Sequence, residues 1–363
     1  MRFADNRNKI GKYIPAVVFL IFIYGMALWF IFSPKPDYSS SEKRYLQKFP
    51  EVTAEKLLSG DFGSEFGTFF ADRFPQRNTW VGLNAYTALA VGNNGASGVY
   101  NCKNGYLINK PVSTENNLDK NIGAVADFAK SIDTPTTVML VPSTGYIVDD
   151  VLPTFHDKYN DDEDISKISS TLSKDKIGFV DLRERFKSEY KNGSQLYYKT
   201  DHHWTTKGAY TGYQELCKAL GITPIDDSTL KKDSYPDFYG TTYSSSGFWL
   251  TPPDNIEIWN NPKNSDRNIS VKITEGANIK TSGSMYFTDH LKEDDKYPVF
   301  IDGNHALTEI TNTNAKNGTI LLIKDSFSHS LAPFLAENYS KVVLVDLRYY
   351  CLLYTSPSPR DRQ

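Results

Sequence analysis

Residues 319–328, Thr-Ile-Leu-Leu-Ile-Lys-Asp-Ser-Phe-Ser, combine a run of apolar residues with a serine, Ser326, shortly after it. A helical segment over 327–337 and a second apolar run, Val342-Val-Leu-Val-Asp346, follow. Strands that are apolar along their whole length and alternate with helices are typical of a parallel sheet with helices on its faces. The stretch therefore predicts an α/β fold with a mostly parallel sheet and a late strand that carries a serine.

The same alternation begins much earlier in the chain. Strands are predicted at 136–141 and 177–180, and helices at 117–131, 182–190 and 208–220. Residues 232–318 are rich in turn-forming residues, and we expect them to cross the active-site face with some strands of their own. In an open α/β sheet the ligand site lies beyond the carboxyl ends of the strands. The side chains expected at that edge are Ser143, Asp201, His203, Ser326 and Arg348.

The densest cluster of catalytic residue types is Thr200-Asp-His-His-Trp-Thr-Thr206, which holds two of the six histidines. Alternate side chains of an extended segment share a face, so Asp201 is expected beside His203, with His202 pointing the opposite way. A serine hydroxyl is a weak nucleophile that needs a base held in one tautomer. The sequence thus predicts a catalytic triad of Ser326, His203 and Asp201. Backbone N–H groups at the start of the helix after Ser326 are expected to stabilise an oxyanion.

Other interpretations of these residues remain open. A serine after a strand is often only a helix N-cap, Asp325 can cap that helix instead, and Ser328 is a competing nucleophile. The adjacent Asp201, His202 and His203 are all metal-ligand types. Because no helical His-x-x-x-His or further ligand at a recognised spacing accompanies them, we expect no metal and no other cofactor.

The N-terminal segment predicts a membrane anchor. Residues 13–33 are uncharged and long enough to cross a bilayer. Basic residues dominate the segment before them, so the positive-inside rule places residues 1–12 in the cytoplasm and the rest of the chain outside. Ser33-Pro-Lys-Pro is a poor cleavage site, which favours an uncleaved signal anchor. We predict a single-pass protein of the cell membrane, with a stalk at 34–47 and an extracytoplasmic domain at 48–350.

The last 13 residues do not resemble the rest of the chain. Residues 351–363, Cys-Leu-Leu-Tyr-Thr-Ser-Pro-Ser-Pro-Arg-Asp-Arg-Gln, resemble translated sequencing-adapter text. We interpret them as an artefact and leave them out of fold reasoning. The natural chain is then expected to continue past Tyr350, so that the domain at 48–350 is truncated at its C-terminal end.

Composition excludes several classes of protein. Apolar residues are 40% and charged residues 23%, which indicates a packed core rather than disorder. The net charge of −3 and the lack of a basic stripe argue against a nucleic-acid partner. Aromatic residues are 13% and are expected mainly in the core, with a sugar-binding face as the alternative. The three cysteines form no disulfide framework, although a Cys102–Cys217 bridge stays open.

A family resemblance rests on several motifs. Thr200-Asp-His-His-Trp-Thr followed by Gly208-Ala-Tyr resembles the signature of the DHHW family, which is similar to alginate O-acetylation proteins of the AlgJ/AlgX type. The resemblance covers residues from about 45 to 350. Further similar stretches are Asp72-Arg-Phe-Pro-Gln-Arg77, Gly105-Tyr-Leu, Phe238-Tyr-Gly-Thr-Thr-Tyr-Ser, Lys324-Asp-Ser-Phe-Ser328 and Asp346-Leu-Arg-Tyr-Tyr350.

The resemblance implies an SGNH-hydrolase-like, flavodoxin-like fold in which the nucleophile strand comes late. It implies a triad at Ser326, His203 and Asp201 and acetyl transfer to, or removal from, an exported polysaccharide. A membrane-bound O-acyltransferase is the implied partner. One departure is that Lys324 stands where the usual Gly-Asp-Ser motif has glycine.

Four further residues are candidates for binding substrate or the oxyanion. The resemblance implies that Arg348 binds an anionic substrate or helps to stabilise the oxyanion. Trp204 either packs the motif loop or offers its face to a sugar. Ser143 follows a predicted strand, and Tyr243 lies in one of the similar stretches.

Two other functions remain open at this point. A non-catalytic glycan-binding or assembly protein of the cell envelope would fit the aromatic content and the membrane anchor equally well. A metal-dependent hydrolase is the third alternative.

Overall fold

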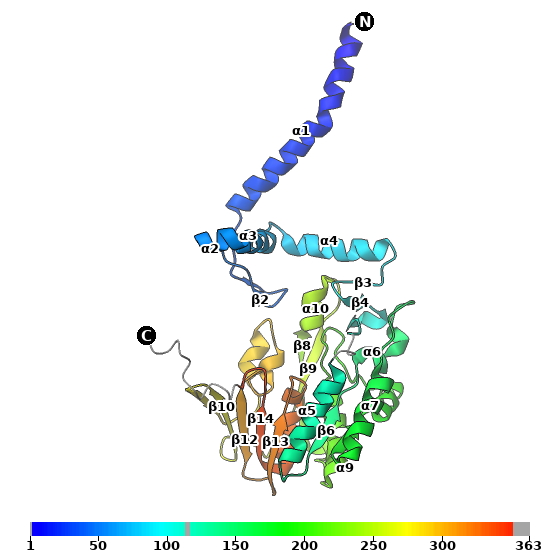
Figure 1. The fold of residues 1–363 in the computed structure, drawn as a ribbon, viewed down its shortest axis with the longest axis vertical. Helices are drawn as coiled ribbons and strands as arrows, with labels where there is room; N and C mark the ends of the chain where they lie inside the picture. Colours follow the sequence, from blue (N-terminus) through cyan, green and yellow to red (C-terminus); the bar gives the residue numbers. More distant parts are fainter. Residues whose placement is uncertain (1, 113–116, 351–363) are drawn as a thin grey trace. The chain divides into compact units, whose positions relative to one another are not determined.

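The computed structural model describes residues 2–112 and 117–350. The chain divides into two compact units, residues 1–87 and the residues from Ala88 on (Figure 1). The predicted artefact at 351–363 lies outside the described residues.

The first unit begins with the long helix α1 (Arg2–Phe32). Its stretch Tyr13–Phe32 is long and apolar enough to cross a membrane, a property that it shares with many signal sequences. The short strands β1 (Tyr38–Ser39) and β2 (Arg44–Tyr45) then pair antiparallel. Helices α2 (Ala54–Ser59) and α3 (Asp61–Asp72) come next and are separate, because Gly60 between them has a φ of +84° and breaks the helix. Helix α4 (Arg77–Ala90) follows.

The segment predicted as a stalk is fastened to the end of α3 by Arg73. This guanidinium is 4% exposed and donates hydrogen bonds to the backbone carbonyls of Lys35, Pro36 and Gln47. It also pairs with the Asp37 carboxylate at 3.0 Å. The first residues after α1 are therefore held against α3.

Asp72 and Arg77 add to this attachment. Asp72 accepts two hydrogen bonds from Arg44, at 2.9 and 2.5 Å, and one from the Gln47 backbone N–H. Arg77 pairs with Glu42 at 3.0 Å. The motif Asp72-Arg-Phe-Pro-Gln-Arg77 thus organises residues 35–47 within the first unit.

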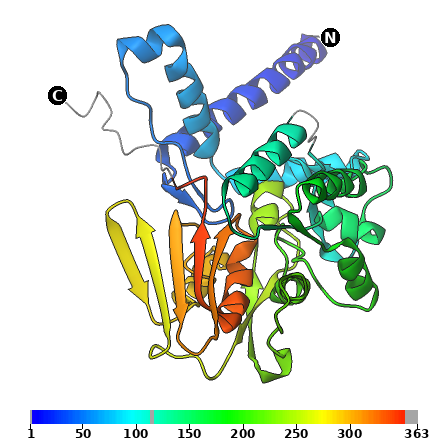
Figure 2. The ribbon, with the colours of Figure 1, turned by 60° about the horizontal axis from the view of Figure 1, so that its bottom comes forward.

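The second unit contains a five-stranded sheet in the order β11-β10-β12-β14-β13 (Figure 2). Only β13 and β14 pair parallel. The strands are β10 (Ile269–Glu275), β11 (Asn278–Ser282), β12 (Leu307–Asn312), β13 (Asn317–Ile323) and β14 (Tyr339–Val345).

The expectation of a mostly parallel sheet is not confirmed, because the sheets are small and mixed. The segment 232–318 was expected to be an excursion, but it contributes β10, β11 and β12, three strands of the main sheet. In β10, buried and exposed side chains alternate, which is typical of an antiparallel strand with one solvated face.

A second parallel pair, β6 (Thr137–Leu140) with β7 (Gly178–Asp181), forms where strands were predicted. The predicted helices form as α5 (Leu118–Ser131), α8 (Arg183–Lys191), α9 (Thr206–Leu220) and α11 (Ser328–Asn338). The remaining elements named below or in Figure 1 are β3 (Gly95–Ala96), β4 (Val99–Asn101), β5 (Leu107–Asn109), α6 (Thr144–Ile147), α7 (Asp161–Lys174), β8 (Lys231–Phe238), α10 (Thr241–Ser246), β9 (Asp254–Asn260) and the short helix η5 (Tyr297–Val299).

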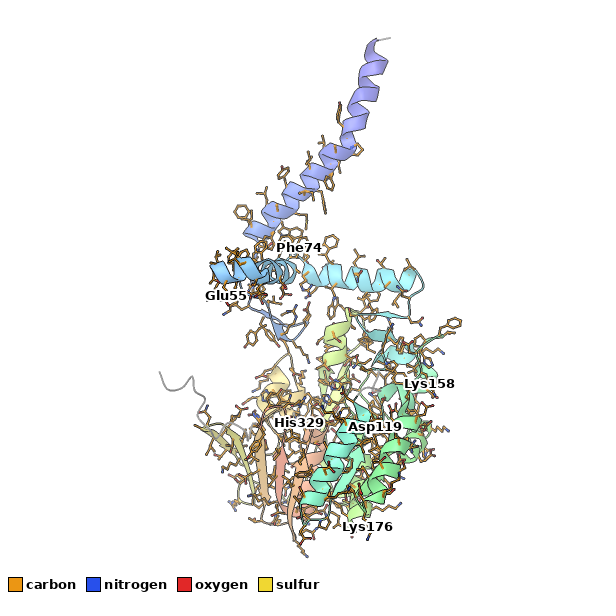
Figure 3. The ribbon with its side chains drawn as sticks, viewed as in Figure 1. Glu55, Phe74, Asp119, Lys158, Lys176 and His329 are labelled. Atoms are coloured by element: carbon orange, nitrogen blue, oxygen red, sulfur yellow. The ribbon has the colours of Figure 1, made fainter. Side chains whose placement is uncertain are left out.

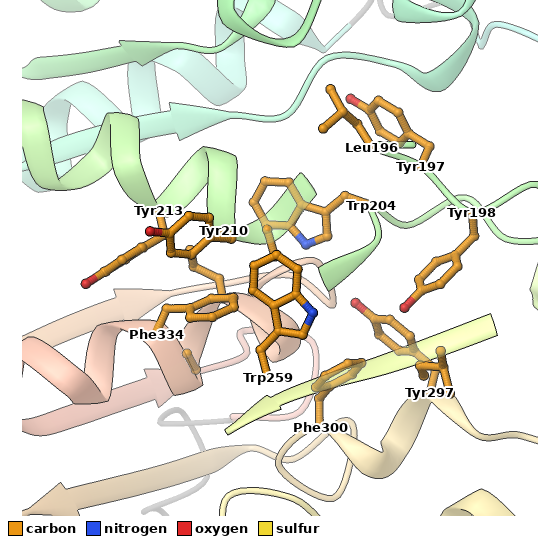
Figure 4. Packing of buried hydrophobic residues seen from close by; sticks show 14 of the residues in the cluster. Leu196, Tyr197, Tyr198, Trp204, Tyr210, Tyr213, Trp259, Tyr297, Phe300 and Phe334 are labelled. Carbon is orange, nitrogen blue, oxygen red and sulfur yellow. The ribbon is translucent and has the colours of Figure 1, made fainter. Parts of the chain in front are cut away.

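Aromatic side chains fill the core between α9, α11 and β9 (Figure 4). The Phe334 ring lies 5.3 Å from Tyr210 and 5.6 Å from Tyr213, and Tyr210 contacts Trp259. Helix α11 also packs on β12 and β14. The two described cysteines are buried and free, so the Cys102–Cys217 bridge does not form.

The Arg73→Ala variant tests the attachment of residues 35–47. Loss of the Arg73 guanidinium leaves three backbone carbonyls without their donor. Leaving a buried polar group without a partner costs about 1–3 kcal/mol. We expect trypsin to cut after Lys43 roughly 10- to 100-fold faster, because local opening limits cleavage. Lys56→Ala, which removes a half-buried pair with Glu65 that does not involve residues 35–47, is the control and should leave this rate unchanged.

Candidate active site

Ser326 lies in the short connection between β13 and α11, at the carboxyl end of the parallel pair. Ile323 of β13 pairs with Val345 of β14, and the next residue, Lys324, donates its N–H to the Val345 carbonyl. Ser326 is half-buried. Its position agrees with the rule that ligand sites lie beyond the carboxyl ends of parallel strands.

The motif Thr200-Asp-His-His-Trp-Thr forms a tight turn rather than an extended segment. Tyr197 and Trp204 pair across it, and the Tyr198 N–H donates to the His203 carbonyl. The prediction that His202 points away from His203 is therefore wrong, since the two rings lie 3.9 Å apart between centroids. The turn places His202 beside His203, whereas an extended strand would have put it on the opposite face.

The three predicted catalytic side chains form one hydrogen-bonded line. Nε2 of His203 lies 2.7 Å from Oγ of Ser326, and Nδ1 of His203 lies 2.5 Å from Oδ1 of Asp201. Burial raises the pKa of Asp201, but the adjacent His203 outweighs burial and holds the pKa well below its usual value. An ionised carboxylate only accepts hydrogen bonds, so Nδ1 carries the ring proton and Nε2 is free to accept from the serine.

The Asp201 carboxylate is held by donors from the start of α10. The Thr241 N–H donates to Oδ2 at 2.7 Å and the Thr241 hydroxyl donates at 3.0 Å. A Cβ at Gly240 would lie 2.1 Å from Cβ of Asp201, so only glycine allows this approach. The His203 N–H adds a donor to Oδ1 at 2.9 Å.

Asp254 anchors the start of the motif from β9. Its carboxylate accepts from the N–H and the hydroxyl of Thr200, at 2.8 and 2.7 Å, and from the Lys199 N–H at 3.0 Å. Sequence reasoning missed Asp254. The only signal was its place after Thr251-Pro-Pro, a rigid turn that fixes where the next residue points.

Trp204 is a core residue and not a sugar-stacking surface. The side chain is 1% exposed, so its face is not open to a ligand. Its indole N–H donates to the Phe327 carbonyl at 3.0 Å and to the Ser330 hydroxyl at 2.9 Å. The tryptophan therefore ties the motif to the first turn of α11, beside Ser326.

Tyr297 of η5 completes the surroundings of His203. Its ring is stacked on the imidazole, with 4.1 Å between centroids and 9° between planes. Burial raises the pKa of Tyr297 well above its usual value, so the hydroxyl keeps its proton. It donates to the Ser326 carbonyl at 3.2 Å. No sequence pattern pointed to this residue.

The expected oxyanion donors at the helix start are occupied. The Phe327 N–H donates to the Asp325 carboxylate at 3.0 Å, and the Ser328 N–H donates to the Asp325 carbonyl. Asp325 thus closes the turn before α11, but it does not cap the helix, because the N-cap position of α11 is Phe327. The prediction that these N–H groups face an oxyanion is wrong for Phe327 and Ser328.

Lys324, the residue in place of the usual glycine, belongs to a buried charge network. Its ammonium is 2% exposed and lies 3.1 Å from the Asp346 carboxylate and 2.7 Å from Nε2 of His329. Arg348 binds the same carboxylate through two nitrogens, at 2.9 and 2.6 Å. This Arg348 guanidinium and the Lys324 ammonium hold the pKa of Asp346 well below its usual range. The network joins the residues that directly follow β13 and β14, and the first of these, Lys324, stands two positions before Ser326 in the chain.

His329, which is labelled in Figure 3, is kept neutral in this network. Burial lowers its pKa well below the usual value, and the Lys324 ammonium lowers it further. The Lys324 ammonium donates to Nε2 of His329. In a protonated ring Nε2 would itself carry a proton, and two donors would then face each other.

The other residues predicted to bind substrate or the oxyanion have partners outside the triad. Arg348 binds Asp346, as described above. The Ser143 N–H donates to the Asp161 carboxylate at 2.6 Å. The Tyr243 N–H donates to the Thr200 carbonyl, and its ring lies 4.3 Å from that of Tyr239.

Asp201, His202 and His203 each offer a ligand atom, and these atoms lie within 4.8 Å of one another. Both nitrogens of His203 already have hydrogen-bond partners, however, and Nδ1 of His202 lies 2.7 Å from the Thr241 hydroxyl. A metal would have to displace these contacts, so the donor set fits hydrogen bonding better than metal binding.

The profile of the DHHW protein family matches residues 109–345, more than half of the chain. This chain belongs to the DHHW family. Its fold is similar to that of a DHHW family protein from Eubacterium siraeum, with a TM-score of 0.58 and 19% identity over 71% of this chain and 85% of that one. No curated protein matches the sequence.

Two further solved structures are similar to this DHHW family member. Bacillus cereus PatB1 with a sulfonyl adduct has a TM-score of 0.57 and 21% identity over 68% of this chain and 86% of that one. The O-acetyltransferase domain of Pseudomonas putida AlgJ has a TM-score of 0.43 and 13% identity over 67% and 78% of the two chains.

The His329→Gln variant tests the neutral histidine, since glutamine still offers Lys324 an acceptor. The folded pKa of His329 lies below its unfolded value of about 6.5, so below that pH the unfolded chain binds a proton that the folded chain does not. Stability should fall as the pH drops below about 6.5, with this residue contributing up to about 1.4 kcal/mol per pH unit. Urea unfolding across this range should show a shallower fall for His329→Gln.

The control for this measurement is His156→Gln, at an exposed histidine. It should keep the wild-type pH dependence. Equal slopes for the wild type and His329→Gln would show that His329 already binds a proton in the folded protein.

Proposed function

We propose that this DHHW family member is a membrane-anchored, extracytoplasmic acyl-transfer enzyme that carries an acetyl group on Ser326. Its acceptor is a hydroxyl of an exported or cell-surface polysaccharide, or water, which makes it an O-acetyltransferase or an acetylesterase. The observation that carries the proposal is the continuous line of hydrogen bonds from Ser326 through His203 to Asp201. A non-catalytic glycan-binding protein requires no such contact, so the geometry favours catalysis.

In the first half of the reaction, Oγ of Ser326 attacks the carbonyl carbon of an acetyl ester while its proton moves to Nε2 of His203. The tetrahedral intermediate then collapses, the donor oxygen leaves, and it takes that proton from His203. In the second half, an acceptor hydroxyl gives its proton to Nε2 and attacks the acetyl-serine. Oγ leaves and recovers the proton, so the enzyme is restored.

Two groups would stabilise His203 while it carries the extra proton. Asp201 supplies a buried negative charge at Nδ1. The Tyr297 ring lies flat on the imidazole, and an aromatic face attracts a cation. We propose both as positioning and charge-stabilising partners of the base.

The N–H groups of Phe327 and Ser328 already donate to Asp325, so other groups must stabilise the oxyanion. The N–H of Ser326 itself is the backbone donor we propose. The side chain of Arg348 is 53% exposed at the neighbouring strand end, and we assign it to an anionic part of the substrate.

The location and the substrate class rest on other features. The apolar stretch Tyr13–Phe32 supports anchoring, with residues 1–12 in the cytoplasm and the catalytic unit outside. The family resemblance supports the polysaccharide and a membrane-bound O-acyltransferase that supplies acetyl groups. The AlgJ domain named above is an O-acetyltransferase, in accord with this assignment.

The Ser326→Ala variant tests the nucleophile in full-length protein with a chromogenic acetyl ester. Loss of the nucleophile should lower the rate about a thousandfold or more, and His203→Ala should have a similar effect. Ser328→Ala is the matched control, and its activity should be unchanged. A Ser326→Ala enzyme with the wild-type rate would reject the mechanism.

A sulfonyl fluoride provides a second test of the same group, since PatB1 has been solved with a sulfonyl adduct. We expect one adduct per chain, on Ser326 by mass spectrometry, and none in Ser326→Ala. A chelator should not change activity. If it abolished activity, the metal-dependent alternative would be favoured instead.

Tyr297 can be tested by comparing two substitutions. Tyr297→Phe keeps the stacked ring, whereas Tyr297→Leu removes it together with its attraction for the protonated base, about 0.5–2 kcal/mol. We expect kcat to fall about tenfold for leucine and less for phenylalanine. The acidic limb of the pH profile should move to lower pH only for leucine, because the imidazolium has lost a stabilising neighbour. Identical profiles for all three proteins would contradict a role for the ring.

A further inference from the structure

The end of α1 is joined to α3 by aromatic contacts. The Phe30 ring, in the last turn of α1, lies 4.7 Å from Phe70 and 6.3 Å from Phe69. Tyr13–Phe32 has 20 residues and therefore spans about 30 Å as a helix, the thickness of a bilayer core. Phe30 is two residues from the end of that span, about 3 Å along the axis. Its aromatic neighbours on α3 would thus meet the bilayer at headgroup depth.

From Phe30, ring contacts continue across the first unit. Phe49 lies 5.4 Å from Phe69 and 6.0 Å from Phe66. Although these rings contact one another, several are exposed to solvent: Phe49 is 58% exposed, Phe66 40% and Phe70 42%. We call this set the aromatic face; its members are Phe49, Phe62, Phe66, Phe69, Phe70 and Phe74.

The aromatic face cannot swing away from α1. Arg73 directly follows α3 and holds the carbonyls of Lys35 and Pro36, which come just after α1. The face is therefore fixed at the point where the apolar helix ends. Any lipid around the end of α1 would also surround these rings.

We propose that the aromatic face lies in the headgroup region of the bilayer and forms a lipid-bound platform beside α1. This inference rests on the proposed membrane anchoring by α1. Phenylalanine rings on the apolar face of an interfacial helix are typically buried about 5–10 Å deep, at the boundary between headgroups and acyl chains. Residues 34–77 carry seven basic and seven acidic side chains, so the attraction is apolar and does not depend on anionic lipid.

Spin labels on single cysteines can test this placement in full-length protein in phosphatidylcholine vesicles. The background replaces Cys102, Cys217 and Cys351 by alanine. Phe66→Cys and Phe70→Cys report on the aromatic face, and Ser64→Cys, at an exposed polar position of α3, is the matched control. Phe22→Cys, within α1, reports on the anchor. Collision with oxygen, which partitions into lipid, is compared with collision with a water-soluble nickel complex.

We expect an oxygen-to-nickel collision ratio several-fold higher at positions 66 and 70 than at 64, unchanged when anionic lipid is added. Two labelled positions are used because one substitution alone could loosen the packing around it. The proposal requires that both labels report lipid. Nickel access at 66 or 70 while position 22 stays in lipid would overturn the platform but leave the anchor standing. Protection from both reagents would overturn it too, because protein would then cover the face. Nickel access at position 22 would refute the anchor itself.

Discussion

The candidate active site depends on one buried carboxylate. Asp201 accepts four hydrogen bonds, two from His203 and two from Thr241, and these donors keep it charged although it is 2% exposed. The charge fixes the proton of His203 on Nδ1 and turns Nε2 toward Ser326. A neutral Asp201 would leave the imidazole free to adopt the other tautomer, in which Nε2 is a donor and the serine loses its base.

Several distant segments support this carboxylate and its histidine. Gly240 opens the space through which α10 reaches Asp201, Asp254 pins the start of the motif, and Tyr297 closes the flat side of the imidazole. Trp204 then links the same turn to α11, beside the serine. The segment 232–318 supplies Gly240, Asp254 and Tyr297. It is therefore a structural part of the site rather than a covering loop.

The sequence was sufficient to predict elements whose pattern is local. The apolar run before Ser326 and the amphipathic helix after Gly208 formed as expected, and the Asp-x-His spacing marked two side chains that do meet. The sequence could not reveal that this spacing folds as a turn, because that depends on Asp254 and Gly240, which are far away in the chain. Nor could it reveal the mixed sheet, since alternating residues such as those of β10 need a partner strand before their direction is defined. Tyr297 carried no local signal, because its role comes only from the ring on which it stacks.

The charge network below the serine has a consequence for how the protein matures. Lys324 is neutralised by Asp346, and Asp346 is also held by Arg348, so the connection after β13 is completed by residues at the far end of β14. A growing polypeptide that has exposed its histidine motif and even Ser326 still lacks these partners. The buried Lys324 ammonium gains its counter-charge only when β14 pairs with β13, so we expect the turn that carries Ser326 to become ordered together with that strand.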